Sequence, residues 1–144
     1  MEKRLEVDIQ VIVHATEDIQ KIFGAFKNVF DVDKEEFSEN TVAGHFENPI
    51  TILSCKLKKK MSQGFVKALI SKIPKDELEL IIEDLQNRCD GSALHIRISK
   101  QSLVRGLVRL GDTDPVKLRI YTPVYIERDL IKTYSEILNG HNLI

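Results

Sequence analysis

The sequence has no tryptophan and only two cysteines among its 144 residues, and it contains no long apolar run. The two cysteines lie far apart, which excludes a disulfide-rich secreted scaffold and favours a reducing compartment. The apolar stretches fall far short of the roughly 20 residues that a membrane span needs. The N-terminus also lacks an apolar segment followed by a small-residue cleavage site. We therefore expect one cytoplasmic domain over residues 1–144, with no membrane contact.

Sequence motifs of catalysis are missing as well. There is no glycine-rich phosphate loop, no Gly-x-Gly-x-x-Gly after a strand and no Gly-x-Ser-x-Gly elbow. The four histidines show no metal-ligand spacing, although a zinc site assembled from distant segments is left open. Cys55, in a strand, and Cys89, on an apolar helix face, are expected to be core residues. We expect that the protein is not an enzyme and has no cofactor, metal or catalytic residue. A hydrolase would be favoured only if His14 and His45 converged beside a carboxylate.

The net charge of −1 hides a strong segregation of charge along the chain. Residues 1–50 hold five basic and eleven acidic side chains, whereas residues 51–75 hold seven lysines and no acid. Residues 76–90 are acidic again, and residues 91–128 carry seven basic against three acidic side chains. Because a polyanion responds to local potential, two basic blocks allow nucleic-acid binding by a nearly neutral protein. The alternative is that opposite blocks neutralise one another across the fold.

Alternation of apolar and polar residues predicts half-buried strands. The expected strands span residues 5–13, 37–44, 49–57, 94–98 and 116–121. A strand that alternates in this way buries one face and leaves the other in solvent. The pattern therefore predicts a sheet with one covered face and one open face.

Apolar residues at helical spacing predict four helices. The first follows Thr16, which stands where an N-cap belongs. The second is broken at Pro74, and the third closes with Gly91 as C-cap. The fourth covers about residues 127–139 and turns Ile131 inward. The element order β-α-β-β-α-α-β-β-α indicates an α+β fold, a mostly antiparallel sheet of about five strands with helices packed on one face.

The open face of this sheet is the first candidate binding surface. The side chains expected to point onto it from the last two strands and from the lysine-rich strand are His95, Arg97, Lys117, Arg119, Tyr121, Lys56 and Lys58. Cations and an aromatic ring on an open sheet can contact phosphates and stack an unpaired base. Glu6 and Asp8 belong to the same face, where they would form cross-strand ion pairs in a structural charge ladder. In that case binding would use loops instead.

Two further segments are basic. Residues 99–111 contain Lys100, Arg105 and Arg109 and two glycines that let the backbone approach a ligand closely. The alternative for this segment is a short helix or bulged strand packed on the core. The lysine run of residues 56–60 lacks any interspersed acid, although a charge run is usually a solvated strand end.

Three strings of the sequence together carry a family resemblance. They are His-Ala-Thr-Glu-Asp at residues 14–18, Gly-His-Phe-Glu-Asn-Pro-Ile at residues 44–50, and Lys100-Gln101 followed by Arg-Leu-Gly at residues 109–111. Over about residues 4–138, the chain resembles the archaeal predicted exosome-associated RNA-binding proteins. Their fold is similar to the RNA-binding domain of ribosomal protein L5. This sequence departs from the pattern at Glu47, in place of glycine, and at Ser99, in place of aspartate.

The resemblance implies a non-catalytic RNA-binding protein, accessory to RNA processing or degradation. It suggests RNA contacts from His14, Thr16, His45, Asn48, Lys100, Gln101 and Arg105, and Arg109 is expected to add a phosphate contact. The partners it implies are RNA and exosome subunits, and exposed sheet edges make a homodimer credible. The alternative is a protein-interaction or scaffold module of an RNA-processing complex, without direct RNA contact.

Overall fold

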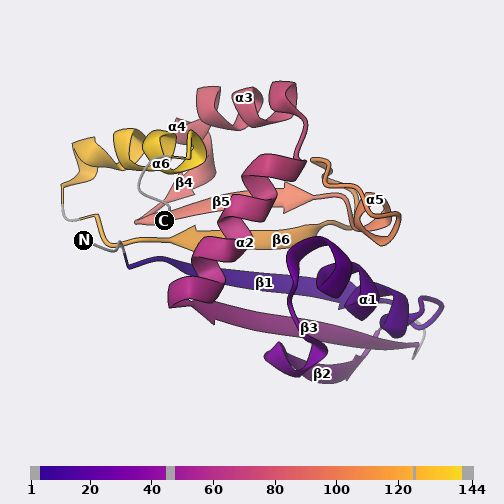
Figure 1. Ribbon diagram of the computed structural model, residues 1–144. Coiled ribbons are helices and arrows are strands. Elements are labelled where there is room, and N and C mark those ends of the chain that lie inside the picture. Colours follow the sequence, from indigo (N-terminus) through magenta and orange to yellow (C-terminus); the bar gives the residue numbers. More distant parts are fainter. Residues whose placement is uncertain (1–3, 45–47, 125, 141–144) are drawn as a thin grey trace.

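The computed structural model describes residues 4–44, 48–124 and 126–140 (Figure 1). Its helices and strands, in chain order, are β1 (Glu6–Val13), α1 (Ile19–Phe30), η1 (Lys34–Glu36), β2 (Phe37–Ala43), β3 (Pro49–Lys58), α2 (Lys59–Lys72), α3 (Lys75–Glu83), α4 (Leu85–Arg88), β4 (Cys89–Asp90), β5 (Ala93–Ile98), α5 (Lys100–Val104), β6 (Val116–Tyr121), η3 (Glu127–Asp129) and α6 (Leu130–Leu138). No helix of these residues is long and apolar enough to cross a membrane.

The strands form a six-stranded sheet in the order β2-β3-β1-β6-β5-β4, and every neighbouring pair is antiparallel. The predicted α+β fold with an antiparallel sheet is therefore confirmed. About five strands were expected, and the sixth is β4, which has two residues and pairs only with β5. Two residues are too few to show alternation, so the sequence pattern carries no signal for β4.

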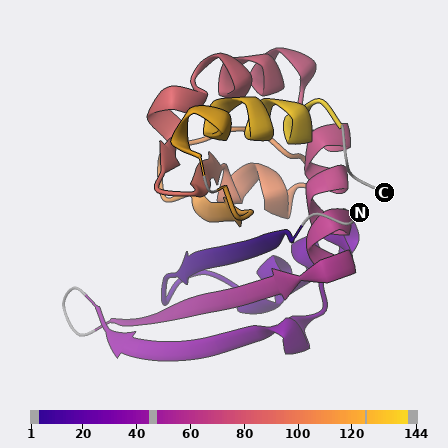
Figure 2. The same cartoon turned by 90° about the vertical axis from the view of Figure 1, so that its left-hand side faces the viewer.

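The helices cover one face of the sheet. Figures 1 and 2 show α2 crossing that face with α1 beside it, and α3, α4 and α6 grouped toward the β5 and β4 end. Strand β1 buries Val7, Ile9 and Val11 on this side, each at most 1% exposed. Aromatic packing joins α1 to α2, since the rings of Phe30 and Phe65 stack with centroids 4.2 Å apart. The opposite face of the sheet stays open, as the alternation predicts.

Four local expectations are wrong. The N-cap of α1 is Asp18 and not Thr16, because the Asp18 carboxylate accepts from the backbone N–H of Gln20 at 2.9 Å. Cys89 lies in β4 rather than on a helix, and Gly91 lies in the turn after it, with φ +62°, rather than at a helix end. Ile131 is 39% exposed rather than buried, and it lines a surface pocket together with Cys89 and Gly91.

The basic segment of residues 99–111, between β5 and β6, contains the short helix α5. Ser99 caps it by accepting from the backbone N–H of Ser102 at 3.1 Å, so the serine in place of the expected aspartate still serves as an N-cap. Leu103 and Val108 of this segment are buried. The alternative of a short helix packed on the core is therefore confirmed.

Candidate nucleic-acid interface

The open face of the sheet brings the two basic blocks of the sequence together. Strand β3 carries Lys56 and Lys58 of the first block, strands β5 and β6 carry Arg97, Lys117 and Arg119 of the second, and β1 lies between β3 and β6. The side chains stand in cross-strand rows set by the strand register. One row is Lys56, Asp8, Arg119 and His95; the next is Ser54, Gln10, Lys117 and Arg97; a third is Lys58, Glu6 and Tyr121.

Strand β1 places two carboxylates at the seam between these blocks. Asp8 lies 3.1 Å from the guanidinium of Arg119 and 3.7 Å from the ammonium of Lys56. Glu6 lies 3.9 Å from the ammonium of Lys58. The cross-strand ion pairs expected of a charge ladder are therefore present, and they involve three of the five Lys and Arg side chains of the face.

The other two cations of the face remain unpaired. Arg97 and Lys117 form no ion pair with any residue that the structure describes, and both are exposed. Arg119 stands in the row between these two cations and Tyr121, and its guanidinium lies 5.4 Å from the centroid of the Tyr121 ring, a cation–π arrangement. Among the residues that the structure describes, the face therefore offers two cations without an ion pair, and an aromatic ring two rows further along the same face.

A groove with polar and apolar lining residues lies on the open face. Its volume is about 740 Å³, and its lining includes Asp8, Gln10, Ser54, Lys56, Lys117 and Arg119. Glu36 also lines the groove. Of the two acidic residues in the lining, Asp8 is paired with cations, and Glu36 has no cation partner in the described part of the chain. Hydroxyl, amide and ammonium groups in a shallow groove suit a phosphodiester backbone with its ribose hydroxyls.

A second polar cluster lies at the end of β1, and Lys100 is its centre. The side chain of Lys100 is 2% exposed, and its ammonium donates to the carbonyl of Ile12 at 2.7 Å. The ammonium also donates to Glu17 at 2.8 Å and to Asp114 at 2.6 Å. Lys100 is thus a buried cation with three protein acceptors, and a phosphate has no access to it. The expected phosphate contact from Lys100 is corrected accordingly.

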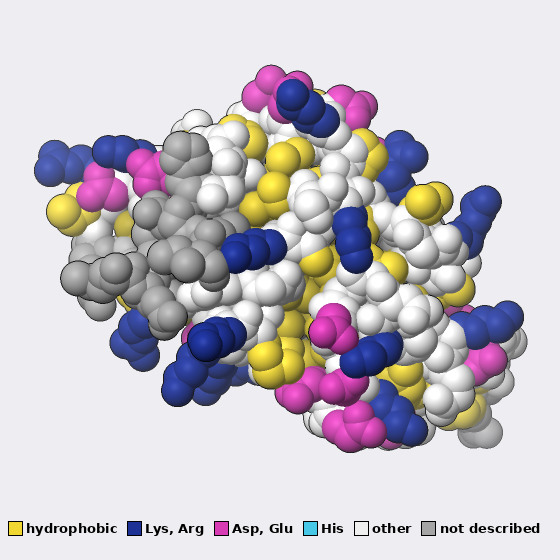
Figure 3. Space-filling model, in the orientation of Figure 1, with side chains coloured by type: hydrophobic (Ala, Val, Ile, Leu, Met, Phe, Trp, Pro, Cys, Tyr) yellow, Lys and Arg dark blue, Asp and Glu magenta, His cyan; other side chains and the backbone are white. Residues whose placement is uncertain are grey.

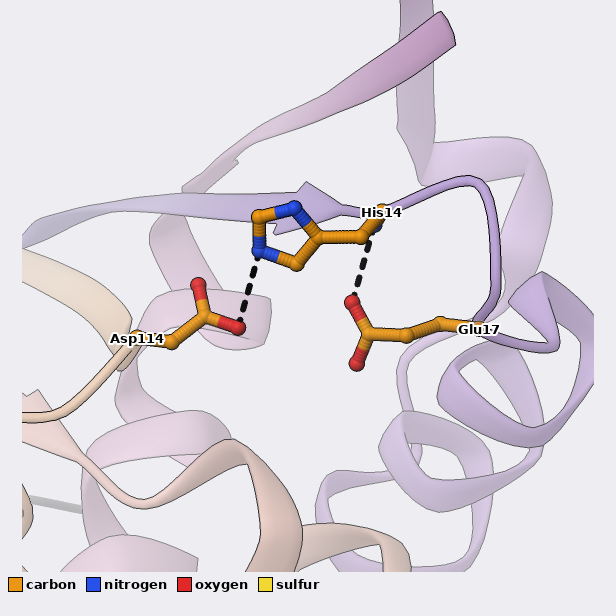
Figure 4. A group of neighbouring side chains, drawn as sticks. All are labelled: His14, Glu17 and Asp114. Atoms are coloured by element: carbon orange, nitrogen blue, oxygen red, sulfur yellow. Dashed lines mark hydrogen bonds and ion pairs between the residues drawn. The ribbon is translucent and has the colours of Figure 1, made fainter. Parts of the chain in front are cut away.

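His14 completes this cluster from the turn after β1. Figure 4 shows its imidazole directed at Asp114, with Nε2 3.1 Å from the carboxylate, while its backbone N–H donates to Glu17 at 2.8 Å. Burial alone would raise the pKa of the Asp114 carboxyl. The hydrogen bonds and charges of Lys100 and His14 outweigh that effect and hold the pKa below its usual range.

The donor atoms of His14, Glu17 and Asp114 lie within 4.8 Å of one another, close enough to hold a metal ion. The Lys100 ammonium already bridges the two carboxylates, however, and so supplies the positive charge that a metal would bring. A divalent ion would have to expel a buried ammonium from three acceptors. We therefore treat the cluster as a structural ion-pair network.

Comparison with known proteins identifies the family. The sequence over residues 6–122, which contain all six strands, matches a family described as RNA binding. The chain belongs to this RNA-binding family.

Relatives of the family support the same assignment. A protein of Pyrococcus abyssi that is named an RNA-binding protein is 24% identical over 145 residues, which cover 94% of each chain. A protein of Methanocaldococcus jannaschii is 29% identical over 128 residues, or 81% of this chain and 86% of that one. The crystal structure of a DUF54 protein of Archaeoglobus fulgidus superposes with a TM-score of 0.78 at 29% identity, over 94% of this chain and 99% of that chain. These relatives are archaeal, whereas the likeness to ribosomal protein L5 stays a prediction.

The other residues of this RNA-binding family member that were predicted to contact RNA do not form one cluster. Thr16, Gln101 and Arg105 are exposed, and Asn48 is an exposed turn residue whose carbonyl accepts from Gly44 N–H at 2.8 Å. Arg109 is half exposed and pairs with Glu77 at 2.6 Å. His45 lies outside the described residues, so the hydrolase condition on His14 and His45 is not tested.

The sequence reasoning missed Asp114, which lies 100 residues from His14. A general signal for it exists, because a buried lysine needs a carboxylate partner and the loop after residue 111 is acidic. That signal becomes usable only once Lys100 is known to be buried.

Neither cysteine of the RNA-binding domain has the character of a nucleophile. Burial raises the pKa of the Cys55 thiol to about 11, and the nearby carboxylates of Glu36 and Asp8 add to the effect. Burial also raises the pKa of Cys89. A thiol that stays protonated at neutral pH is a poor nucleophile and metal ligand.

Proposed function

We propose that this protein is a non-catalytic RNA-binding domain whose open sheet face contacts the RNA. The observation that carries the proposal is the pair Arg97 and Lys117, two cations without an ion-pair partner in the described part of the chain. They lie on the same open face as the Tyr121 ring, and Lys117 also lines the groove of that face. Membership of the RNA-binding family supports it. We expect the two cations to bind phosphates and the ring to stack on an unpaired base.

The ion pairs on β1 shape how the face would work. Arg119 and Lys56 share the carboxylate of Asp8, so a phosphate that approaches either cation competes with Asp8 for it. Arg97 and Lys117 need no such exchange and therefore provide the first contacts. An open sheet with an exposed ring favours single-stranded RNA, because a duplex hides its base faces.

The resemblance supports a finer role in the same proposal. The domain would act in the cytoplasm as an accessory to RNA processing or degradation, with exosome subunits as its protein partners. Without catalytic machinery of its own, it would hold RNA for an enzyme of the complex.

The test compares a face variant with a matched control. Arg97→Ala combined with Lys117→Ala removes two cations from the open face, and Lys67→Ala combined with Lys132→Ala removes two exposed lysines from helices α2 and α6. Fluorescence anisotropy of a single-stranded RNA of about 12 nucleotides, measured between roughly 50 and 200 mM salt, gives affinity and salt slope. We expect the face variant to bind at least about tenfold more weakly, with a salt slope reduced by about two. Equal loss in both double variants would contradict a role for the open face.

A protein-interaction module is the alternative, and one observation favours it. Val104 and Leu107 of the α5 segment are 39% and 50% exposed beside the exposed Arg105. Exposed apolar side chains next to a charged one suit a protein partner or a second copy of this chain. Arg105→Ala combined with Leu107→Ser should then abolish the partner complex or the dimer, measured by light scattering, while RNA affinity is retained. Loss of RNA binding in this variant would instead assign the segment to RNA.

A further inference from the structure

A pocket lies at the end of the sheet where β1 begins and β3 and β6 end. Its volume is about 550 Å³, and its lining includes Arg4, Glu6, Lys58, Lys59, Gln63 and Tyr121. Figure 3 shows Lys and Arg side chains gathered at the lower left of the molecule, where Figure 1 places the end of β3 and the beginning of α2. Three cations against one carboxylate make this pocket attractive to an anion.

The first turn of helix α2 forms one wall of the pocket. The helix has 14 residues, but its first turn contains no acidic residue, and its N-cap Lys58 makes no side-chain cap. A helix begins with free backbone N–H groups and a partial positive charge, so acidic or hydroxyl side chains are favoured there. Lys58, Lys59 and Lys60 instead add positive charge to the positive end. That arrangement is unfavourable alone and becomes favourable when an anion binds.

Gln63 is a buried polar side chain in the wall of the pocket. The residue is 7% exposed and lines the pocket, yet its side chain makes no hydrogen bond to any residue within the described ranges. Buried polar side chains are nearly always hydrogen-bonded, and the pocket is where the Gln63 side chain can find a partner. An oxygen-rich ligand in the pocket would satisfy the Gln63 amide N–H.

The helix start is held rigidly in place. Ser62 is fully buried, and its hydroxyl lies 2.7 Å from the carbonyl oxygen of Leu5 and 2.6 Å from that of Lys59, so it anchors the helix to the chain just before β1. Lys59 has φ +56°, a left-handed conformation that disfavours any residue with a side chain. The pocket is thus preformed, and it includes a lysine at a position where glycine would fit the backbone better.

We propose that this pocket binds the terminal phosphate monoester of an RNA chain. The phosphate would lie against the first turn of α2, with Lys59 and Arg4 as counter-charges and the Gln63 amide as donor. The terminal base would stack on Tyr121, whose ring belongs both to this pocket and to the open face. The proposal rests on the proposed function, because it places an RNA end beside the RNA path over β5 and β6.

The experiment uses dinucleotides that differ only in their end groups. Binding of pUpU, UpUp and UpU to the full chain is measured by calorimetry, and amide NMR shifts of residues 59–62 locate the phosphate, with inorganic phosphate as a further probe. We expect pUpU or UpUp to bind at least about tenfold more tightly than UpU, because a phosphate monoester adds charge-assisted hydrogen bonds. Tighter binding of pUpU than of UpUp assigns the pocket to the 5′ end, and the reverse order assigns it to the 3′ end. If pUpU and UpUp bind equally and both more tightly than UpU, the pocket accepts a monoester at either end. Equal affinity of all three dinucleotides overturns the proposal.

Two variants separate binding from folding. Gln63→Leu keeps the buried volume and removes the amide, and Lys59→Gly removes the cation while relieving the left-handed backbone. Both should abolish the preference for a terminal phosphate, whereas Lys59→Gly should leave the melting temperature unchanged or raise it. Lys67→Ala, on the same helix but outside the pocket, is the matched control and should keep the preference. A preference that survives both pocket variants overturns the assignment.

Failure of this proposal differs from failure of the proposed function. If longer RNA binds through Arg97 and Lys117 but end chemistry makes no difference, only the pocket is wrong. If terminal phosphate binds in the pocket while the Arg97 and Lys117 double variant behaves as wild type, only the open face is wrong.

Discussion

Asp8 lies at the centre of the open face, between the two basic blocks of the sequence. It holds Arg119 at 3.1 Å and Lys56 at 3.7 Å, and its Oδ1 atom is buried without a hydrogen bond in the described part of the protein. A carboxylate in this position occupies the place that a phosphate would take. At the scale of single residues, Asp8 therefore neutralises part of the positive charge of the open face.

Replacing Asp8 tests this directly. Asp8→Asn keeps the shape of the side chain and releases the charges of Arg119 and Lys56, so RNA should bind at least about threefold more tightly at moderate salt. Anisotropy with single-stranded RNA measures the change. Glu83→Gln, an exposed carboxylate on α3, is the control and should have little effect. Weaker binding after Asp8→Asn would show that Asp8 positions the cations rather than competing with RNA.

Lys100 illustrates the opposite outcome, a cation that serves the fold. Its ammonium is buried between Glu17 and Asp114, and removing one partner of a buried ion pair costs about 3–5 kcal/mol. Because Glu17 and Asp114 are partly exposed, we expect Lys100→Ala to lower the free energy of unfolding by about 3 kcal/mol. Urea unfolding measures this loss. Gln101→Ala, an exposed neighbour, should change it by less than about 0.5 kcal/mol.

A different result would reassign Lys100. If Lys100→Ala left stability intact but weakened RNA binding, the residue would be a phosphate contact, as its place in the sequence suggests.

At the scale of elements, strands were predicted closely because the sheet has one buried face. Alternation placed residues 5–13 and 94–98 in strands, and the structure has Glu6–Val13 and Ala93–Ile98. The start of α1 was misplaced, because Thr16 and Asp18 are both good N-caps and propensity does not choose between them. The choice follows from Glu17, which is held in the turn by His14 N–H and by Lys100, 83 residues away. Such a long-range tie has no local signature.

Tyr134 attaches helix α6 to the sheet. The residue is fully buried, and its hydroxyl accepts from the backbone N–H of Thr122 at 3.2 Å and lies within hydrogen-bonding distance of the carbonyls of Ile120 and Ser92. Burial raises the pKa of Tyr134 to about 12, so the hydroxyl remains protonated.

Removing this hydroxyl should loosen α6. Tyr134→Phe leaves the buried Thr122 N–H without its acceptor, which costs about 1–3 kcal/mol. Chemical denaturation should show a loss in this range, and hydrogen exchange should speed up in α6 more than in α1. An unchanged exchange rate in α6 would mean that apolar packing alone holds the helix.

At the scale of the whole molecule, segregation of charge along the chain becomes segregation in space. The strand residues of the blocks 51–75 and 91–128 share one face, where β3 and β6 flank β1. The sequence shows the blocks, but not their meeting, since strand order depends on pairing between distant segments. Neither pattern nor motif indicates that Arg119 forms an ion pair while Arg97 and Lys117 form none with the described residues. That difference follows from the register, which places Asp8 opposite Arg119. The assignment of RNA binding to the open face thus depends on the fold.

One measurement tests that assignment most directly. An NMR titration of the isotope-labelled protein with a single-stranded RNA of about 12 nucleotides reports which backbone amides change. The account predicts the largest changes in β5 and β6, around Arg97, Lys117 and Tyr121, with further changes where α2 begins. Changes confined to α5 and to the turn after β1 would contradict it and return the binding site to the loops.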